Sequence, residues 1–282
     1  MGNGSRLVPG SGAPAPVGES ASRFRGMRWH VLLSPPADGA QNMALDEVLM
    51  ARARRTGEGV VRVYEWAHPT LSLGRNQRAI GVYTAQRAAD AGVDLVRRPT
   101  GGRALLHHRE ITYSVTAPVP AQASLTASYR AINVLLLEAL RALGVRAHVV
   151  SASGRCPPPA SAPCFERPAP GELIADGRKL VGSAQLREDG AMLQHGSILV
   201  RDDQATILRL AASSVGAPVP AASLADLLGR EPPAAEFAAA LFAAVRRTWD
   251  AHASALPDAA TLAREAELAR QRYTDAAWTW RR

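Results

Sequence analysis

Apolar and polar residues alternate with a period of two in several short stretches of this sequence, and such alternation predicts half-buried β-strands. The clearest stretch is EITYSVTAP, residues 110–118, in which Ile111, Tyr113 and Val115 alternate with threonine and serine. Other apolar stretches bounded by turn residues predict further strands, in segments 27–34, 60–67, 70–75 and 93–107. In the last of these, two strands should meet at a hairpin tip formed by Gly101 and Gly102.

Two segments have the spacing of an amphipathic helix. Residues 37–55 include the motif NMALDEVL, and residues 126–143 carry an apolar stripe that ends just before Gly144. The stripe consists of Ile132, Leu135, Leu136, Ala139, Leu140 and Leu143. From about residue 203 onward the chain is rich in alanine and again helical in pattern, with breaks at GAPVP, REPP and ALPDA.

Between these parts, the pairs Asp176-Gly177 and Asp189-Gly190 predict two tight hairpin turns and therefore a three-stranded meander. A turn at Asp189-Gly190 would place Gln185 opposite Gln194 and Ser183 opposite Gly196. Alternation along RKLVGSAQLR puts Lys179, Ser183 and Gln185 on one face of the sheet, and Gly182 and Ala184 on the other. The polar face is either a site or an ordinary solvent-facing sheet surface.

These elements predict the α+β class, with a mixed, mostly antiparallel β-sheet flanked by helices. We expect three parts along the chain. Residues 1–26, rich in Gly, Pro and Ser, form a disordered leader; residues 27–202 form the catalytic domain; and residues 203–282 form a helical segment packed on that domain.

Composition narrows the possible functions. The 282 residues, 47% of them hydrophobic, can bury a large core without a disulfide or metal. Two cysteines form no disulfide framework, and no Cys/His cluster has zinc-site spacing, so we expect no metal and a reducing, cytoplasmic setting. No signal peptide or membrane-spanning run is expected. The net charge of +8 favours acidic partners, or it reflects only the base composition of the genome. The arginines are scattered and form no basic arm of the kind that binds nucleic acid.

The proline-rich segment 151–171 holds both cysteines, Cys156 and Cys164. A thiol becomes nucleophilic when a nearby cation stabilises its thiolate, and a hairpin fold could bring Lys179 to Cys164. Cys164 is therefore a candidate nucleophile. The alternatives are an inert thiol or a disulfide with Cys156.

In the segment RRPTGGRALLHH, residues 97–108, two arginines precede the Gly-Gly pair, and an arginine and two histidines follow it. Backbone amides at Gly101 and Gly102 can bind a carbonyl or phosphate, and Arg97 or Arg98 can pair with an anion. The segment lacks the P-loop pattern and the dinucleotide-binding fingerprint. His107 and His195, taken singly, are typical of structural histidines.

Together, NMALDEVL, RRPTGGRALLH, GRKLVGSAQ and QHGSIL resemble the biotin/lipoate ligase-transferase superfamily, in that family's order and over roughly residues 27–200. PCFERP before the lysine strand resembles the cysteine-dependent octanoyltransferases of lipoate assembly. That resemblance implies a thioester on Cys164 and assistance from Lys179, without a cofactor. It also implies substrate binding by Arg97, Arg98, Gly101, Gly102, His107, Ser183, Gln185, His195 and Gly196.

The same resemblance implies the partners. The donor would be octanoyl-acyl carrier protein, and the acceptor a lysine of the glycine cleavage H protein or of a lipoyl domain of the 2-oxoacid dehydrogenases. Three alternatives stay open: an ATP-dependent lipoate-protein ligase, an octanoyl amidotransferase acting between lipoyl domains, and a non-catalytic protein that binds a carrier protein or nucleic acid.

Overall fold

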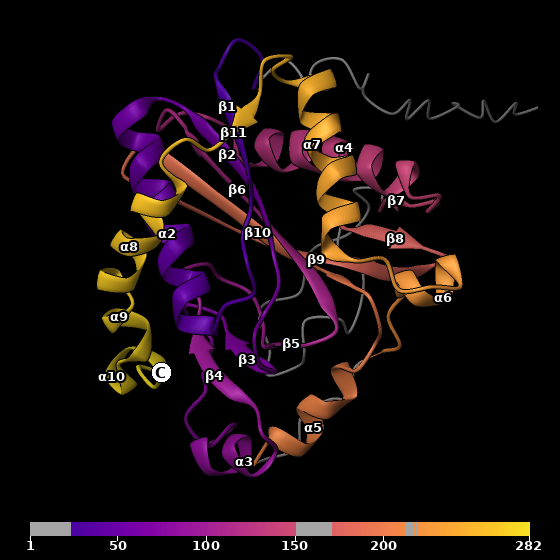
Figure 1. Cartoon of the computed structure of the whole chain (residues 1–282). Helices are drawn as coiled ribbons and strands as arrows, with labels where there is room; N and C mark the ends of the chain where they lie inside the picture. Colours follow the sequence, from indigo (N-terminus) through magenta and orange to yellow (C-terminus); the bar gives the residue numbers. More distant parts are fainter. Residues whose placement is uncertain (1–23, 151–170, 213–216, 218) are drawn as a thin grey trace, which may run out of the picture.

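The structure is a computed structural model that describes residues 24–150, 171–212, 217 and 219–282. Within these residues, eight strands form a large sheet and three form a small one (Figure 1). The order in the large sheet is β11 (Ser254–Ala255), β1 (Trp29–Leu33), β2 (Gly59–Tyr64), β6 (Glu110–Pro118), β10 (Ala191–Leu199), β9 (Arg178–Glu188), β8 (Leu173–Ala175) and β7 (His148–Val149). The order in the small sheet is β4 (Asp94–Arg97), β3 (Thr70–Leu73) and β5 (Leu105–His107).

The large sheet is mixed, since β11, β1 and β2 run parallel and the remaining neighbours are antiparallel. The predicted meander is β8–β9–β10. Asp189 and Gly190 have φ angles of 49° and 79°, the left-handed pair that a two-residue hairpin turn requires. Gln185 lies opposite Gln194 and Ser183 opposite Gly196, so the predicted register is confirmed.

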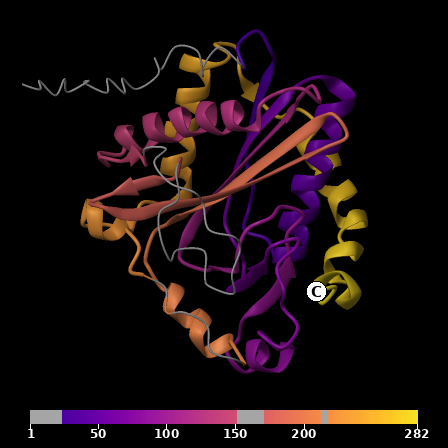
Figure 2. The same ribbon diagram turned by 180° about the vertical axis from the view of Figure 1, so that it is seen from behind.

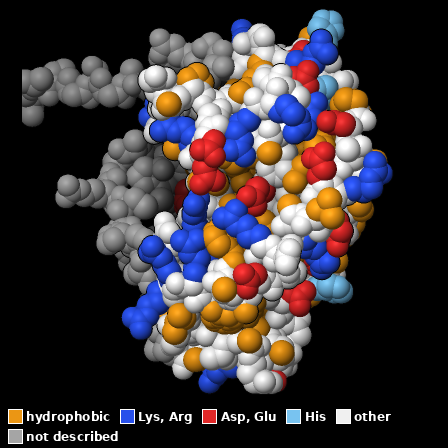
Figure 3. Space-filling model, turned by 90° about the vertical axis from the view of Figure 1, so that its left-hand side faces the viewer, with side chains coloured by type: hydrophobic (Ala, Val, Ile, Leu, Met, Phe, Trp, Pro, Cys, Tyr) orange, Lys and Arg blue, Asp and Glu red, His pale blue; other side chains and the backbone are white. Residues whose placement is uncertain are grey.

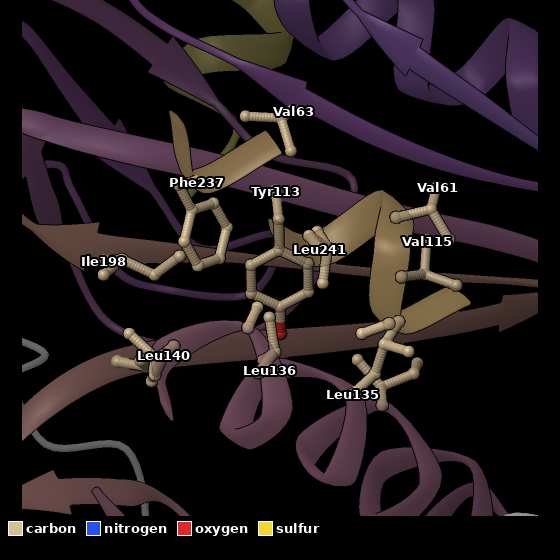
Figure 4. Close-up of a cluster of buried hydrophobic side chains, with 14 of the residues drawn as sticks. Val61, Val63, Tyr113, Val115, Leu135, Leu136, Leu140, Ile198, Phe237 and Leu241 are labelled. Carbon is tan, nitrogen blue, oxygen red and sulfur yellow. The ribbon is translucent and has the colours of Figure 1, made fainter. Parts of the chain in front are cut away.

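Helices cover both faces of the large sheet (Figures 1 and 2). The described α-helices are α2 (Gly39–Thr56), α3 (Ala85–Asp90), α4 (Leu125–Ala142), α5 (Ile207–Leu210), α6 (Leu224–Leu228), α7 (Ala234–Thr248), α8 (Ala259–Ala269), α9 (Gln271–Thr274) and α10 (Ala276–Thr279). On one face, Tyr113 and Val115 of β6 meet Leu136 of α4 and Leu241 of α7 (Figure 4). Each such buried side chain contributes about 1.5–3 kcal/mol. The other face packs against α2. The predicted α+β class is confirmed.

The C-terminal helices α8 and α9 pack along α2, and α10 contacts β4. The side of the molecule that carries α2 and α8–α10 mixes basic and acidic side chains (Figure 3). At the other end of the described chain, Phe24 is buried and packs on Trp29 and Trp249. The three-part division of the chain stays a prediction. No described helix combines the length and apolarity needed to cross a bilayer.

The predicted hairpin tip at Gly101 and Gly102 is wrong. β4 and β5 do not pair with each other, because β3 lies between them, parallel to β4 and antiparallel to β5. The Arg98 amide donates to the Leu73 carbonyl (2.8 Å), so the chain still follows the end of β3 just after β4. It then returns along the other side of β3 as β5. Residues 98–104 therefore form a connecting loop, here called the glycine loop, and not a turn.

Candidate active site

A cavity that is partly open to solvent lies between the large sheet, the small sheet and α2. Its walls come from α2 (Met43), β2 and the segment after it (Tyr64 and Trp66), β5, β6, the β9–β10 hairpin and the glycine loop. Six of the residues predicted for the site line it: Arg98, Gly102, His107, Ser183, His195 and Gly196. Gly182 and Ala184, on the face of β9 predicted to be apolar, line it as well.

Small residues make room for this cavity. A Cβ atom on Gly196 would lie 2.6 Å from the Gly182 carbonyl oxygen and 2.7 Å from the Ser183 hydroxyl. A Cβ atom on Gly74 would lie only 2.0 Å from the carbonyl oxygen of Gly102. The close packing of β10 against β9 at Gly196, and of the glycine loop against Gly74, is therefore possible only because these two positions lack side chains.

One buried network holds His195 in the wall. Its Nδ1 lies 3.1 Å from the Asp46 carboxylate and its Nε2 lies 2.7 Å from the Thr100 hydroxyl. Burial lowers the pKa of His195, although Asp46 acts against this. The neutral ring then donates from Nδ1 to Asp46 and accepts at Nε2 from Thr100, which ties the glycine loop to the sheet.

Asp46 itself is fully buried and is also bound by Arg62 (2.8 Å) and Ser114 (2.8 Å). Burial alone would raise its pKa. The hydrogen bond from His195 and the charge of Arg62 outweigh burial, so the pKa of Asp46 is lowered and the carboxylate stays charged.

A second network holds His107. Its ring stacks on Trp66 with centroids 3.9 Å apart, and Nδ1 lies 2.6 Å from the Glu110 carboxylate. Glu110 also accepts from Thr112 (2.6 Å) and from Ser197. His107 Nε2 lies 2.6 Å from the Ser72 hydroxyl. Both ring nitrogens are thus engaged by the protein, which suits a wall residue better than a proton carrier.

The Arg98 side chain holds the glycine loop in place through hydrogen bonds. Its guanidinium donates to the Ser72 hydroxyl (2.5 Å) and carbonyl (2.9 Å), and to the carbonyls of Gly101 (3.0 Å) and Arg103 (2.9 Å). In a trans peptide the N–H points opposite to the C=O. The Gly102 N–H therefore points away from Arg98.

Three of the predicted substrate-binding residues, Arg97, Gly101 and Gln185, do not line the cavity, and neither does Lys179. The Arg97 side chain is fully buried behind the glycine loop and donates to the carbonyls of Gly74 and Gln77. Gln185 donates to the Gln194 side chain (2.7 Å), and a Cβ atom on Gly101 would meet nothing within 4 Å.

Lys179 is 3% exposed, and its ammonium lies 2.6 Å from the Glu172 carboxylate. Glu172 follows the segment that contains the cysteines. Cys156 and Cys164 lie outside the described residues, but the two ends of their segment are joined: the Gly171 amide donates to the Val150 carbonyl (3.0 Å) and the Val150 amide to the Glu172 carbonyl (2.9 Å). The base of this segment therefore lies beside Lys179.

Sequence reasoning missed Asp46, Glu110 and Trp66 as parts of the site. A charged residue on the apolar face of a predicted helix was the available signal for Asp46, because it lies one turn after Met43. No comparable signal marked Glu110. In the described part of the chain, no group of three or more metal-binding side chains gathers.

The model of the lipoyl protein ligase A/B catalytic domain matches residues 38–246, well over half of the chain. The chain belongs to this family. The resemblance expected from the four motifs is thereby confirmed. Residues 247–282 lie outside the match.

The chain is also similar in sequence to curated octanoyltransferases. The octanoyltransferase LipM of Kyrpidia tusciae is 44% identical over 180 residues, which cover 61% of this chain and 66% of the relative. That of Carboxydothermus hydrogenoformans is 39% identical over 64% of this chain and 68% of the relative. The octanoyltransferase LipM of Staphylococcus aureus is 39% identical over 61% of this chain and 65% of the relative. The aligned part thus spans about two thirds of each relative.

Solved structures share the fold. A lipoate-protein ligase A bound with ATP superposes with a TM-score of 0.70 at 22% identity, covering 90% of this chain and 99% of that one. A bipartite lipoate protein ligase from Thermoplasma acidophilum superposes with a TM-score of 0.68 at 21% identity. The superposition covers 90% of this chain and 96% of that one. At this identity the likeness establishes the architecture alone.

Proposed function

We propose that this protein is an octanoyltransferase of protein lipoylation, which moves an octanoyl group from a carrier thioester to a lysine of a lipoyl domain. The observation that carries the proposal is its 37–44% identity to curated octanoyltransferases. The cavity on the β9–β10 hairpin supports it, because a mainly hydrophobic slot suits an unbranched acyl chain.

The acyl chain would lie along Gly182, Ala184 and Gly196, which line the cavity. Lys179 precedes Ser183, which lines the cavity, by four residues on the same face of β9, which corresponds to about 13 Å. The carbonyl end of the substrate would therefore lie toward Lys179, with the tail in the cavity.

Cys164 is our candidate nucleophile. Its thiolate would attack the donor thioester carbonyl, form a new C–S bond and release the carrier thiol, which takes up a proton. The acceptor lysine amine would then attack the acyl-cysteine, form the amide and release the Cys164 thiol. Cys164 precedes Gly171 by seven residues, a reach of at most roughly 25 Å. The closed base of its segment at Val150 and Glu172 supports its meeting Lys179.

Lys179 and the glycine loop would stabilise charge. The Lys179 ammonium favours a neighbouring thiolate and later the oxyanion of the tetrahedral intermediate. The Gly102 N–H, turned away from Arg98, is a candidate second donor to that oxyanion. His107 and His195 would shape the wall beside the acyl chain.

The donor in this proposal is octanoyl-acyl carrier protein, and the acceptor is the glycine cleavage H protein or another lipoyl domain, in the cytoplasm. The net charge of +8 supports acidic protein partners. The thioester is already activated, so the proposed reaction uses no ATP and no cofactor.

The test supplies octanoyl-acyl carrier protein and an apo lipoyl domain without ATP, and follows the acceptor by mass. Octanoylation of the acceptor lysine supports the proposal. Modification only from free octanoate with Mg-ATP would identify a ligase instead, and modification only from an octanoylated H protein would identify an amidotransferase.

A further inference from the structure

The C-terminal segment Asp275–Arg282 is hydrogen-bonded to the strand that leads into the glycine loop. The Trp278 indole N–H donates to the Arg97 carbonyl (2.9 Å), and Arg97 Nε donates to the Thr279 carbonyl (2.8 Å). The Arg282 carbonyl accepts from the amides of Ala79 (2.9 Å) and Ile80 (3.1 Å). The segment therefore contacts both the end of β4 and the connection that follows β3.

The Arg97 side chain connects this segment to Gly74 and Gln77, which lie beside the glycine loop. Its Nη1 donates to the carbonyls of Gly74 (2.5 Å) and Gln77 (2.8 Å). Burial lowers the pKa of Arg97 to about 10, and the nearby charges of Arg281 and Arg98 add to this. These carbonyls accept from Nε and Nη1 and hold the side chain in one place, while Nη2 has no hydrogen-bond partner among the described residues.

Gly74 then touches the cavity wall. The space between Gly74 and the Gly102 carbonyl is too small for a methyl group, and the Arg75 amide donates to the Thr100 carbonyl (2.7 Å). Gly102 lines the acyl cavity. A continuous path of contacts thus runs from Trp278 through Arg97 and Gly74 to the wall of the cavity.

We propose that the segment Asp275–Arg282 is a positioning element of the active site, which fixes the glycine loop and thereby sets the discrimination between acyl chains of different length. This inference rests on the proposed octanoyltransferase function. It gives Arg97 a positioning role in place of the substrate contact expected from the sequence. It also gives a role to residues beyond the matched family domain, which ends at residue 246.

The test compares kcat/KM for octanoyl and dodecanoyl carrier thioesters in Trp278→Phe, Arg97→Lys and the unaltered protein. Trp278→Phe keeps an aromatic ring and removes the hydrogen bond to the Arg97 carbonyl. The ratio of the two kcat/KM values does not depend on the fraction of enzyme that is folded, so a merely structural role would leave it unchanged. Leu268→Ser, at an 83% exposed position on α8, is the matched control within the C-terminal region.

We expect the preference for octanoyl to fall roughly 3- to 10-fold in both variants, the scale of one net hydrogen bond, and to stay unchanged in Leu268→Ser. An unchanged ratio in both variants would overturn the inference while leaving the proposed function intact. Absence of transfer from any thioester by the unaltered protein would overturn both.

Discussion

At the scale of single residues, the site depends on charged groups that are buried and fully paired. Asp46 binds Arg62, Ser114 and His195, and Glu110 binds His107, Thr112 and Ser197. Burying a carboxylate is costly, and removal of one partner leaves the other uncompensated. These groups are therefore vulnerable to substitution even where they do not touch a substrate.

Asp46→Asn should lower the free energy of unfolding by about 3 kcal/mol or more at pH 7, because it leaves the Arg62 guanidinium buried without its counter-charge. Urea denaturation measures this. The pKa of Asp46 is lowered in the folded state, so its contribution is present above about pH 4 and disappears below it. Glu267→Gln, on the exposed side of α8, is the control and should change stability by less than about 0.5 kcal/mol.

His195 should make stability depend on pH. Burial lowers its pKa below the usual value of about 6.5, so the unfolded chain binds a proton that the folded chain does not. The free energy of unfolding should therefore fall as the pH is lowered from about 6.5. His195→Gln should flatten the curve between pH 7 and 5 in urea titrations. Parallel curves for the two proteins would contradict this assignment.

At the scale of elements, the β9–β10 hairpin and the glycine loop form two walls of the cavity. The hairpin is held by its register and its Asp189-Gly190 turn. The loop has no regular pairing and is held by Arg98, Thr100 and the contact with Gly74. The loop is therefore the more easily disturbed of the two walls.

Gly74→Ala should reduce octanoyl transfer roughly tenfold or more, because the added methyl group would lie 2.0 Å from the Gly102 carbonyl and displace the loop. Steady-state rates with octanoyl-acyl carrier protein measure the effect. Gly101→Ala places a methyl group where nothing lies within 4 Å and should cost much less. Equal losses in the two variants would show that the close approach at Gly74 is unimportant.

Local patterns predicted those elements whose shape depends on neighbours in sequence. The helix expected at 126–143 is α4 (Leu125–Ala142), and both Asp-Gly turns form as expected. The hairpin tip at Gly101 was wrong because the insertion of β3 between β4 and β5 is a pairing across distant sequence. The networks around Asp46 and Glu110 were missed for the same reason, since their partners come from several elements.

At the scale of the whole molecule, the excess of positive charge should govern the encounter with acidic proteins. The formal net charge is +8 and the isoelectric point is near 10.4. Attraction between exposed charges weakens as the Debye length falls with added salt. Charge therefore bears on association and not on the chemical step.

Raising sodium chloride from about 50 to 200 mM should increase KM for octanoyl-acyl carrier protein several-fold and leave kcat nearly constant. A small thioester such as octanoyl-pantetheine is the control, since it lacks the acidic protein surface and its KM should change little. A salt-independent KM for the carrier would mean that contacts other than charge hold the donor.

The central claim is that the acyl group passes through Cys164, and intact mass tests it most directly. The protein is mixed with octanoyl-acyl carrier protein, without ATP and without acceptor. We predict a single octanoyl adduct that hydroxylamine removes, that is absent in Cys164→Ala and that persists in Cys156→Ala. An adduct that survives Cys164→Ala, or one that forms only with octanoate and Mg-ATP, would contradict the account.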